Sequence, residues 1–144
     1  MSTEANKAAI RRIYEEVWNQ GNLATVDEVR AVDFAFHGPG GAEEKGRAGL
    51  KEFVTKFRAA FPDVCATVEN IVAEGEYVAL RTSTTGTHRG DWMGIPPTGK
   101  RVTLTCNILS RFAEGKQVEV WEEFDRLSLL QQLGVAPPMG QPGT

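Results

Sequence analysis

The sequence predicts an α+β protein in which helices cover one face of a curved antiparallel sheet. Up to about Phe61, apolar residues recur at the three- and four-residue spacing of amphipathic helices. From Cys65 to Asp125 the pattern changes to a period of two, which is typical of strands. Helices gathered early and hairpin-linked strands gathered late are the pattern of an α+β fold.

Each element of the helical half has a local signal. In the first helix Ile10, Ile13 and Val17 fall at helical spacing, and Gly21 is placed to end the helix. Pro62 closes the last helix of this half, because its ring cannot continue a helix. The helices are expected at residues 3–20, 24–30 and 46–60, with a short strand at 33–37.

The strand half is divided by two turns. Glu74-Gly75 and residues 114–116 each contain the glycine of a tight turn, which predicts two hairpins. One domain over residues 1–136 is the simplest division, and residues 137–144 are expected to be a disordered tail. The strands are expected at residues 65–73, 77–88, 101–112 and 117–125, followed by a short apolar helix at 127–133.

Bulk properties argue against several classes of partner. The 144 residues carry a formal net charge of −3, so neither nucleic acid nor an anionic membrane is expected as a partner. No apolar run approaches the roughly 20 residues that span a bilayer, and no signal peptide is recognisable, so a cytoplasmic location is expected. Cys65 and Cys106 are expected to be reduced and buried, and no His or Cys spacing indicates a metal site.

The most informative segment is the strand expected near the end of the chain. One face of it carries Glu119, Trp121, Glu123 and Asp125, and the other carries Val118, Val120 and Phe124. An ionised carboxylate without partners resists leaving water. The acidic face therefore either looks into solvent or lines a cavity in which a carboxylate has a chemical task, and the indole of Trp121 favours the cavity.

Five short motifs occur in order along the chain. They are WNQGN at 18–22, FPD at 61–63, GTHRG at 86–90, GIPPTGK at 94–100 and QQLG at 131–134. In this order they closely resemble the SnoaL-like polyketide cyclases of the nuclear-transport-factor-2-like superfamily, from about residue 8 to residue 137. The motifs are mostly turn and packing signatures, so they indicate the fold better than the substrate.

The resemblance implies a cone-shaped, half-open barrel, in which the curved sheet wraps over the N-terminal helices and encloses an apolar pocket. It also implies a homodimer formed through the sheet and an activity that needs no metal or organic cofactor. The acid/base carboxylate of such cyclases ends the last long strand, which is the place of Asp125 in this sequence. A His on a neighbouring strand assists in some members, and residues 101–112 contain none.

Asp125 is therefore the first catalytic candidate. A carboxylate in an apolar pocket has a raised pKa and can take a proton from a carbon flanked by carbonyls. Asp125 also precedes the last expected helix, where Asp is a favoured N-cap. The two roles are compatible if one carboxylate oxygen stays free.

Three further residues are candidate acid/base groups. Glu123 shares the face of Asp125, or else points to water at the strand edge. His37 ends the first strand beside a Gly-rich loop, where it is placed at the mouth of the expected pocket. His88 lies in the GTHRG turn, where a structural hydrogen bond is the competing role, and Glu119 is expected to be solvated or to face a dimer partner.

Aromatic and polar residues are the candidate substrate contacts, each weighed against plain packing. Tyr14 and Trp18 lie one helical turn apart and face the sheet, and their polar tips suit a substrate oxygen. Trp92 and Met93 either close over a ligand or pack on a dimer partner, and Asn107 is a candidate donor to an enolate oxygen. The full set is Tyr14, Trp18, Phe36, Phe57, Trp92, Met93, Asn107 and Trp121.

The predicted function is a cofactor-independent cyclase that closes a carbon ring in a small, hydrophobic, polyketide-derived substrate. One form is an intramolecular aldol closure with Asp125 as base and Asn107, Tyr14 or His37 as donor. The other is pericyclic closure of a linear polyene, accelerated by holding its ends together. An isomerase or epoxide hydrolase on the same fold, and a non-catalytic dimeric module that binds a small molecule, are the alternatives.

Overall fold

The computed structural model describes residues 2–136, which form helices and one mixed sheet. The predicted α+β class is confirmed. The helical elements are α1 (Thr3–Arg12), the π-helical segment η1 (Ile13–Trp18), α2 (Ala24–Val29), the 3₁₀ turn η2 (Pro39–Gly41), α3 (Ala48–Ala60) and α4 (Arg126–Gln132). The strands are β1 (Arg30–His37), β2 (Glu43–Lys45), β3 (Cys65–Glu74), β4 (Tyr77–Thr87), β5 (Arg101–Ala113) and β6 (Lys116–Phe124).

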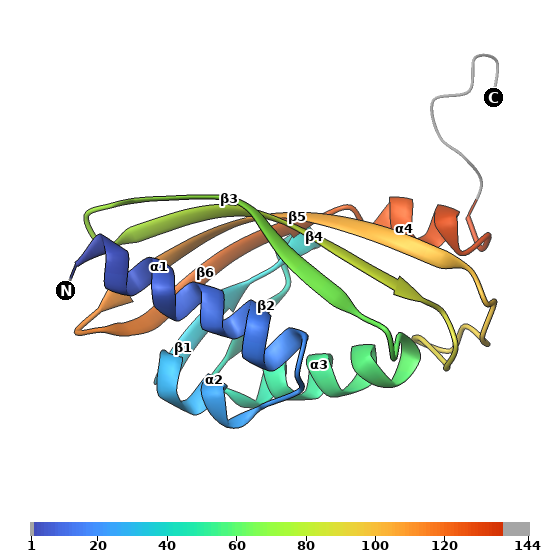
Figure 1. Ribbon diagram of the computed structural model, residues 1–144, viewed down its shortest axis with the longest axis horizontal. Coiled ribbons are helices and arrows are strands. Elements are labelled where there is room, and N and C mark those ends of the chain that lie inside the picture. Colours follow the sequence, from blue (N-terminus) through green and yellow to red (C-terminus); the bar gives the residue numbers. More distant parts are fainter. Residues whose placement is uncertain (1, 137–144) are drawn as a thin grey trace, which may run out of the picture.

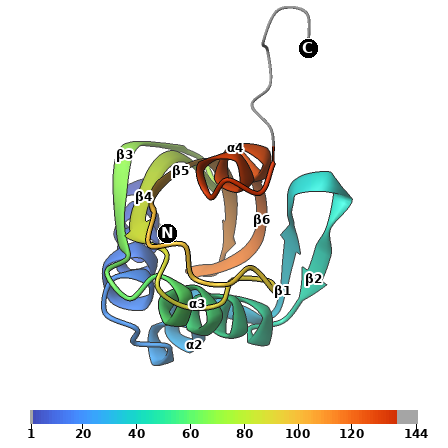
Figure 2. The same ribbon diagram turned by 90° about the vertical axis from the view of Figure 1, so that its right-hand side faces the viewer.

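The sheet has six strands in the order β2-β1-β6-β5-β4-β3. Its long strands curve over α1, α2 and α3, and the end-on view shows an open, barrel-like wall around an interior (Figures 1 and 2). The cone-shaped, half-open barrel is therefore confirmed. One strand pair departs from the expected antiparallel sheet, since β1 runs parallel to β6. No hairpin dictates the orientation of this pair, because its two strands lie far apart in the sequence.

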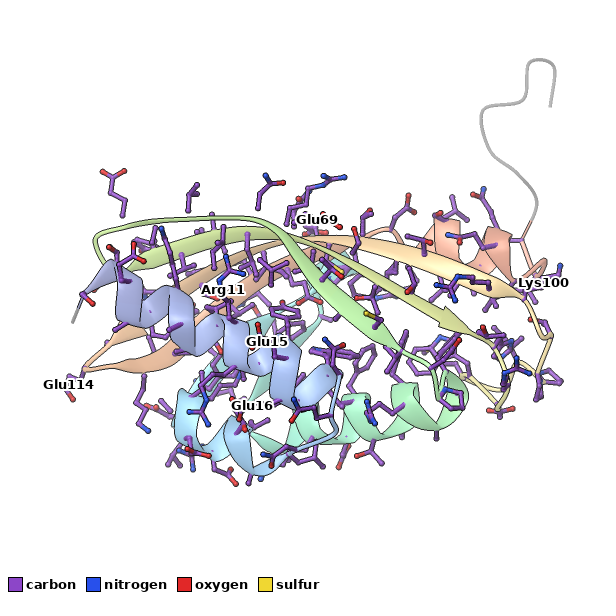
Figure 3. All side chains as sticks on the ribbon, in the orientation of Figure 1. Arg11, Glu15, Glu16, Glu69, Lys100 and Glu114 are labelled. Carbon is purple, nitrogen blue, oxygen red and sulfur yellow. The ribbon has the colours of Figure 1, made fainter. Side chains whose placement is uncertain are left out.

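The strands span the length of the molecule. Lys100 and Glu114, which flank β5, lie at opposite ends of the structure (Figure 3). The antiparallel pairs β3–β4, β4–β5 and β5–β6 form the predicted hairpin half. This long wall supplies the inner surface of the barrel.

The N-terminal helix differs from prediction in its last turns. Ser2 caps α1 by accepting a hydrogen bond from the backbone N–H of Ala5 at 3.0 Å. From Ile13 to Trp18 the helix is π-helical, a local widening that often occurs at functional sites. Gly21 ends the segment with φ of +74°, in the left-handed region that glycine adopts at low cost.

One boundary differs from prediction, and two short elements were not predicted. β1 begins at Arg30, where a continuation of the second helix was expected, because this residue pairs with Gln117 of β6. The short strand β2 and the turn η2 were not predicted, because glycines and charged residues there give no periodic signal. The expected disordered tail at 137–144 lies outside the described residues, and none of the helices within residues 2–136 is long and apolar enough to cross a bilayer.

The core lies between the concave face of the sheet and the helices. A first cluster joins the end of α3 to the loop after β4, with Phe57, Phe61 and Trp92 in contact. A second cluster, which contains Ile10 and Phe34, joins α1 and β1 to β4, β5 and β6. Between these clusters the interior is not completely filled, and this space positions the site.

The two cysteines have different environments, and neither forms a disulfide within the described residues. Cys65 is exposed, so the expectation that it is buried is wrong: its side chain points away from the core at the start of β3. Cys106 is half-buried inside the barrel, where burial raises the pKa of its thiol to about 12.

Titration of the native protein with a thiol reagent such as DTNB at pH 8 should therefore show one fast thiol. Cys65 reacts first, because only the thiolate attacks and Cys106 has a roughly 1000-fold smaller thiolate fraction than an ordinary thiol. Cys65→Ser should remove the fast phase and leave the slow phase unchanged. A fast phase that persists in this variant would contradict the assignment.

Candidate active site

A cavity of about 240 Å³ opens between η1, β1, α3 and the end of β6. Aromatic and aliphatic side chains form most of its wall, and four ionisable groups reach it besides the phenol of Tyr14. The wall consists of Ile13, Tyr14, Trp18, Arg30, Phe34, Phe36, Pro39, Ala42, Glu44, Gly46, Gly49, Leu50, Phe53, Glu122, Phe124 and Arg126. An apolar pocket with a few convergent polar groups is the usual form of a small-molecule site.

Strand β6 presents Glu122 to this cavity. The predicted alternation is confirmed, but the inward face is the one that carries Val120, Glu122 and Phe124. The face with Trp121 and Glu123 points to the outside of the barrel, so the expectation that it lines the interior cavity is wrong. Val120 and Phe124 determine which face of β6 points inward. The free energy gained by burying them outweighs the cost of placing one carboxylate, that of Glu122, at the wall of a cavity.

Glu122 is held in an environment that favours its neutral form. Burial raises the pKa of its carboxyl to about 7, and the attraction of Arg30 opposes this shift only in part. Within residues 2–136, Glu122 forms no hydrogen bond or ion pair that would stabilise its charge. Such a carboxylate is close to half-ionised at neutral pH, which is the condition for exchanging protons with a bound molecule.

Tyr14 lies beside Glu122 on the helical wall of the cavity. Burial raises the pKa of its phenol well above the ordinary value, and the negative charge of Glu122 adds to the shift. The phenol therefore stays protonated and serves as a hydrogen-bond donor. The cavity thus combines a titrating carboxylate with a neutral O–H donor.

A smaller cavity of about 40 Å³ adjoins the first one beside β4 and β5. Several residues line both cavities, among them Tyr14, Glu122 and Phe124. Phe57 and Cys106 line only the smaller space. Glu122 therefore lies where the two cavities meet, within reach of a molecule that occupies either.

The main catalytic prediction, Asp125, does not reach either cavity. Its side chain is exposed, and one oxygen accepts a hydrogen bond from the backbone N–H of Ser128 at 2.8 Å, which caps α4. The expectation that this carboxylate projects into the apolar interior is therefore wrong. The strand ends one residue earlier, so Asp125 turns out toward the helix that it caps.

The other three acid/base candidates also lie away from the cavities. Glu123 is exposed on the outer face of the sheet. His37 lies on the outer side of β1, where Nε2 is 2.8 Å from Glu119 and Nδ1 is 3.2 Å from Glu43, and where its ring stacks on Trp121. The bond to Glu119 is the main cause that raises the pKa of His37.

His88 is a buried structural residue of the loop after β4. Its Nδ1 lies 3.0 Å from Oγ1 of Thr98, and its ring stacks on Phe61 with centroids 5.3 Å apart. Within the described residues its Nε2 has no hydrogen-bond partner. The expected structural role in the GTHRG turn agrees with this placement.

The predicted substrate contacts divide into three groups. Tyr14, Trp18 and Phe36 line the larger cavity and Phe57 lines the smaller one. Trp92 is 5% exposed in the core, and Met93 beside it is 79% exposed. Asn107 and Trp121 lie in a shallow groove on the outer face of the sheet, so neither reaches the interior.

Sequence reasoning missed Glu122 and Arg30, both of which line the cavity. A signal for Glu122 was present, since it is a single carboxylate on the alternating apolar face between Val120 and Phe124. Arg30 gave no signal, because a cation at the end of a predicted helix is ordinarily solvated. Within residues 2–136, no three His, Cys, Asp or Glu side chains are grouped in a way that could hold a metal ion.

The sequence matches the SnoaL-like polyketide cyclases over residues 8–133, and the chain belongs to this family. No functionally curated protein matches it. The fold agrees, because a half-open barrel of this kind is the nuclear-transport-factor-2-like fold of which SnoaL-like proteins are members.

Solved structures of similar architecture include two proteins from Streptomyces. AclR from Streptomyces galilaeus, described as a "putative hydroxylase", is 31% identical with a TM-score of 0.85, over 97% of this chain and 87% of AclR. IdmH from Streptomyces antibioticus, described as a "putative polyketide cyclase", is 37% identical with a TM-score of 0.79, over 90% of this chain and 99% of IdmH. A protein from Acidithiobacillus ferrooxidans with the same description is 33% identical with a TM-score of 0.77, over 95% of this chain and all of that one.

Proposed function

We propose that this protein is a cofactor-independent cyclase that closes a carbon ring in a polyketide-derived intermediate, with Glu122 as its acid/base group. The observation that carries the proposal is an unpaired carboxylate with a pKa of about 7 in an aromatic-walled cavity. Membership of the SnoaL-like family supports the substrate class. Glu122 takes the role expected of Asp125, because Asp125 is exposed and caps a helix.

The proposed reaction is an intramolecular aldol closure. Ionised Glu122 removes a proton from a carbon beside a carbonyl group, and the resulting enolate oxygen accepts a hydrogen bond from the phenol of Tyr14. The enolate carbon then attacks a second carbonyl carbon of the same chain, which forms the ring bond and an alkoxide. Protonated Glu122 returns its proton to the alkoxide, so the enzyme ends in its initial state.

Two other reactions suit the same cavity. Its aromatic wall supports pericyclic closure of a linear polyene, in which the shape of the cavity brings the reacting ends together. The pairing of a carboxylate with a phenol supports an isomerase that moves a proton between two carbons of one substrate. The three reactions differ in whether Glu122 removes a carbon-bound proton and whether a ring forms.

Proton removal can be tested without the natural substrate. In D₂O, the protein should accelerate deuterium incorporation beside the carbonyl of a benzo-fused bicyclic ketone such as 2-tetralone, followed by NMR. Acceleration that disappears in Glu122→Gln supports the aldol and isomerase reactions, and a ring in the product of a linear 1,3-polyketone selects the aldol. Equal exchange in wild type and buffer would overturn proton transfer by Glu122.

The rate of this exchange should rise with pH and level off above about 7. Glu122 accepts a proton only when ionised, and burial raises its pKa to about 7, so each pH unit below this value lowers the active fraction about tenfold. The measurement is the enzyme-dependent rate between pH 5 and pH 9 after subtraction of the buffer rate. A rate that falls as pH increases from 5 to 7 would instead indicate that the protonated form is active.

We further propose that the outer face of the sheet forms a homodimer, as the family resemblance implies. Val72, Leu109 and Trp121 expose apolar surface there, with exposed fractions of 65%, 39% and 36%. They lie in one shallow groove that runs over β3, β4, β5 and β6. A contiguous apolar patch of this kind is typical of a surface that a partner covers.

Trp121→Glu should therefore convert a dimer into a monomer, because each protomer would bury an unpaired carboxylate in an apolar interface. The measurement is sedimentation velocity, with Val32→Glu as a control that adds the same charge at a residue which is 74% exposed and outside the groove. A wild-type protein that sediments as a monomer would contradict this proposal.

A further inference from the structure

Arg30 is a buried cation at the wall of the larger cavity. It is only 7% exposed, although a buried charge without partners is costly. Its Nε donates a hydrogen bond to Oε1 of Gln117 at 2.7 Å, and its guanidinium carbon lies 4.0 Å from the centroid of the Phe34 ring. Gln117 in turn donates from Nε2 to Oγ of Ser110 at 2.8 Å. This chain of contacts fixes the orientation of the guanidinium group.

The two terminal nitrogens of Arg30 remain available. Neither donates a hydrogen bond to any residue between 2 and 136, whereas Arg30 lines the cavity. Glu122 shares this cavity but forms no ion pair with Arg30 within the described residues. Burial lowers the pKa of Arg30 to about 10, so the group is still a cation at neutral pH. A fixed, desolvated guanidinium with unused donors beside a cavity is an arrangement that binds an anion.

We propose that Arg30 binds a carboxylate group of the substrate, with Gln117 and Ser110 as positioning residues. The planar fork of a guanidinium matches the two oxygens of a carboxylate, and the match is strengthened where water is excluded. This inference rests on the proposed function, because it concerns the same cavity. It adds a substrate class, a hydrophobic polyketide acid that enters as the free carboxylate and not as an ester or amide.

The positions of the other polar groups around the cavity agree with a substrate whose carboxylate is bound by Arg30. Arg30 and Glu122 line the same cavity, and the guanidinium lies close enough to the carboxylate to oppose part of the rise in the pKa of Glu122, so a carboxylate held by Arg30 places the adjoining carbon chain near the acid/base group. Tyr14 borders both cavities from the helical side. Glu44 and Arg126 also line the larger cavity and are exposed, and the negative charge of Glu44 acts on Arg30 more weakly than that of Glu122 because solvent screens it.

The test compares two flat bicyclic probes that differ in charge, 2-naphthoate and 2-naphthamide, by isothermal titration calorimetry. At pH 6 Glu122 is mainly protonated and does not repel the naphthoate. Wild type should bind naphthoate about tenfold or more tightly than the amide, as charge-assisted hydrogen bonds predict. Arg30→Met should reduce this ratio to about one while binding of the amide stays within about threefold of wild type.

Matched variants separate recognition from folding. Arg11→Gln removes an exposed Arg of α1 and should keep the wild-type ratio. Arg30→Lys keeps the charge without the planar fork and should give an intermediate ratio. If Arg30→Met does not fold, Gln117→Met and Ser110→Ala serve in its place, and each should lower the naphthoate-to-amide ratio because the guanidinium is held less firmly.

A wild-type ratio near one, or no measurable binding of naphthoate, would overturn the role of Arg30. The deuterium exchange described for Glu122 uses a neutral ketone. It therefore tests the proposed acid/base chemistry independently of anion binding by Arg30. A ratio that is unchanged in Arg30→Met, with the variant folded, would likewise overturn the inference.

Discussion

Glu122→Gln is expected to lower kcat about 100- to 10,000-fold, the usual range for removal of a positioned acid/base group. The amide has nearly the same shape as the carboxylate and can still fill its place in the wall. It cannot accept a proton from carbon, so the loss should appear in kcat more than in KM. The measurement is steady-state turnover of the cyclisation substrate, or the deuterium exchange rate where this substrate is not at hand.

Two other carboxyl-to-amide substitutions serve as controls for Glu122→Gln. Asp125→Asn should keep near-wild-type activity, because Asn also caps a helix and the side chain is exposed. Glu114→Gln changes an exposed hairpin residue at the end of the molecule and should be silent (Figure 3). Loss of activity in Asp125→Asn with little change in Glu122→Gln would reverse the assignment of the base.

The stability of Glu122→Gln provides an independent check. Because burial raises the carboxyl pKa from 4.5 to about 7, the folded state binds more protons than the unfolded state between these values. Wild type therefore loses stability as pH rises through this window, by up to about 3 kcal/mol. The Tm of Glu122→Gln relative to wild type should be higher at pH 8 than at pH 5, which separates lost chemistry from lost folding.

Phe61→Ala is expected to lower the free energy of unfolding by about 3–5 kcal/mol, a large share of the 5–15 kcal/mol that holds a typical domain. Phe61 is fully buried at the end of α3 and stacks on Phe57 with centroids 4.6 Å apart. It also packs against Gly86 of β4, where an added Cβ would come within 2.9 Å of the Phe61 Cβ. The cavity left by its removal cannot collapse, because helix and strand are held in place by other contacts.

Urea denaturation would measure this loss. Phe53→Ala is the matched control on the same helix, and it should cost clearly less because Phe53 is 38% exposed at the wall of the cavity. Equal losses for the two variants would contradict the view that Phe61 anchors the aromatic core.

Much of the fold could be predicted from local signals. The strands β3 to β6 follow from the alternation of apolar residues, and their two hairpins follow from Gly75 and Gly115. The helices were found because their apolar residues recur at helical spacing. The parallel pairing of β1 with β6 could not be found in this way, because it joins segments far apart in the chain and leaves no mark on either.

The site was predicted only in part. Tyr14, Trp18, Phe36 and Phe57 were named as substrate contacts and line the two cavities. The carboxylate was placed on the wrong face of β6, because alternation divides a strand into two faces without saying which of them is inside. Asp125 appeared catalytic through its position at the strand end, whereas the start of α4 decides its contacts.

By itself the sequence determined the α+β class, the order of the longer helices and strands and membership of the SnoaL-like family, because periodicity and turn motifs are local properties of the chain. The tertiary structure alone decided that Glu122, Tyr14 and Arg30 meet at one cavity. The physical reason is that the pKa and the free donors of these groups depend on burial and on neighbours from distant strands and helices. Such surroundings exist only after the sheet has curved over the helices.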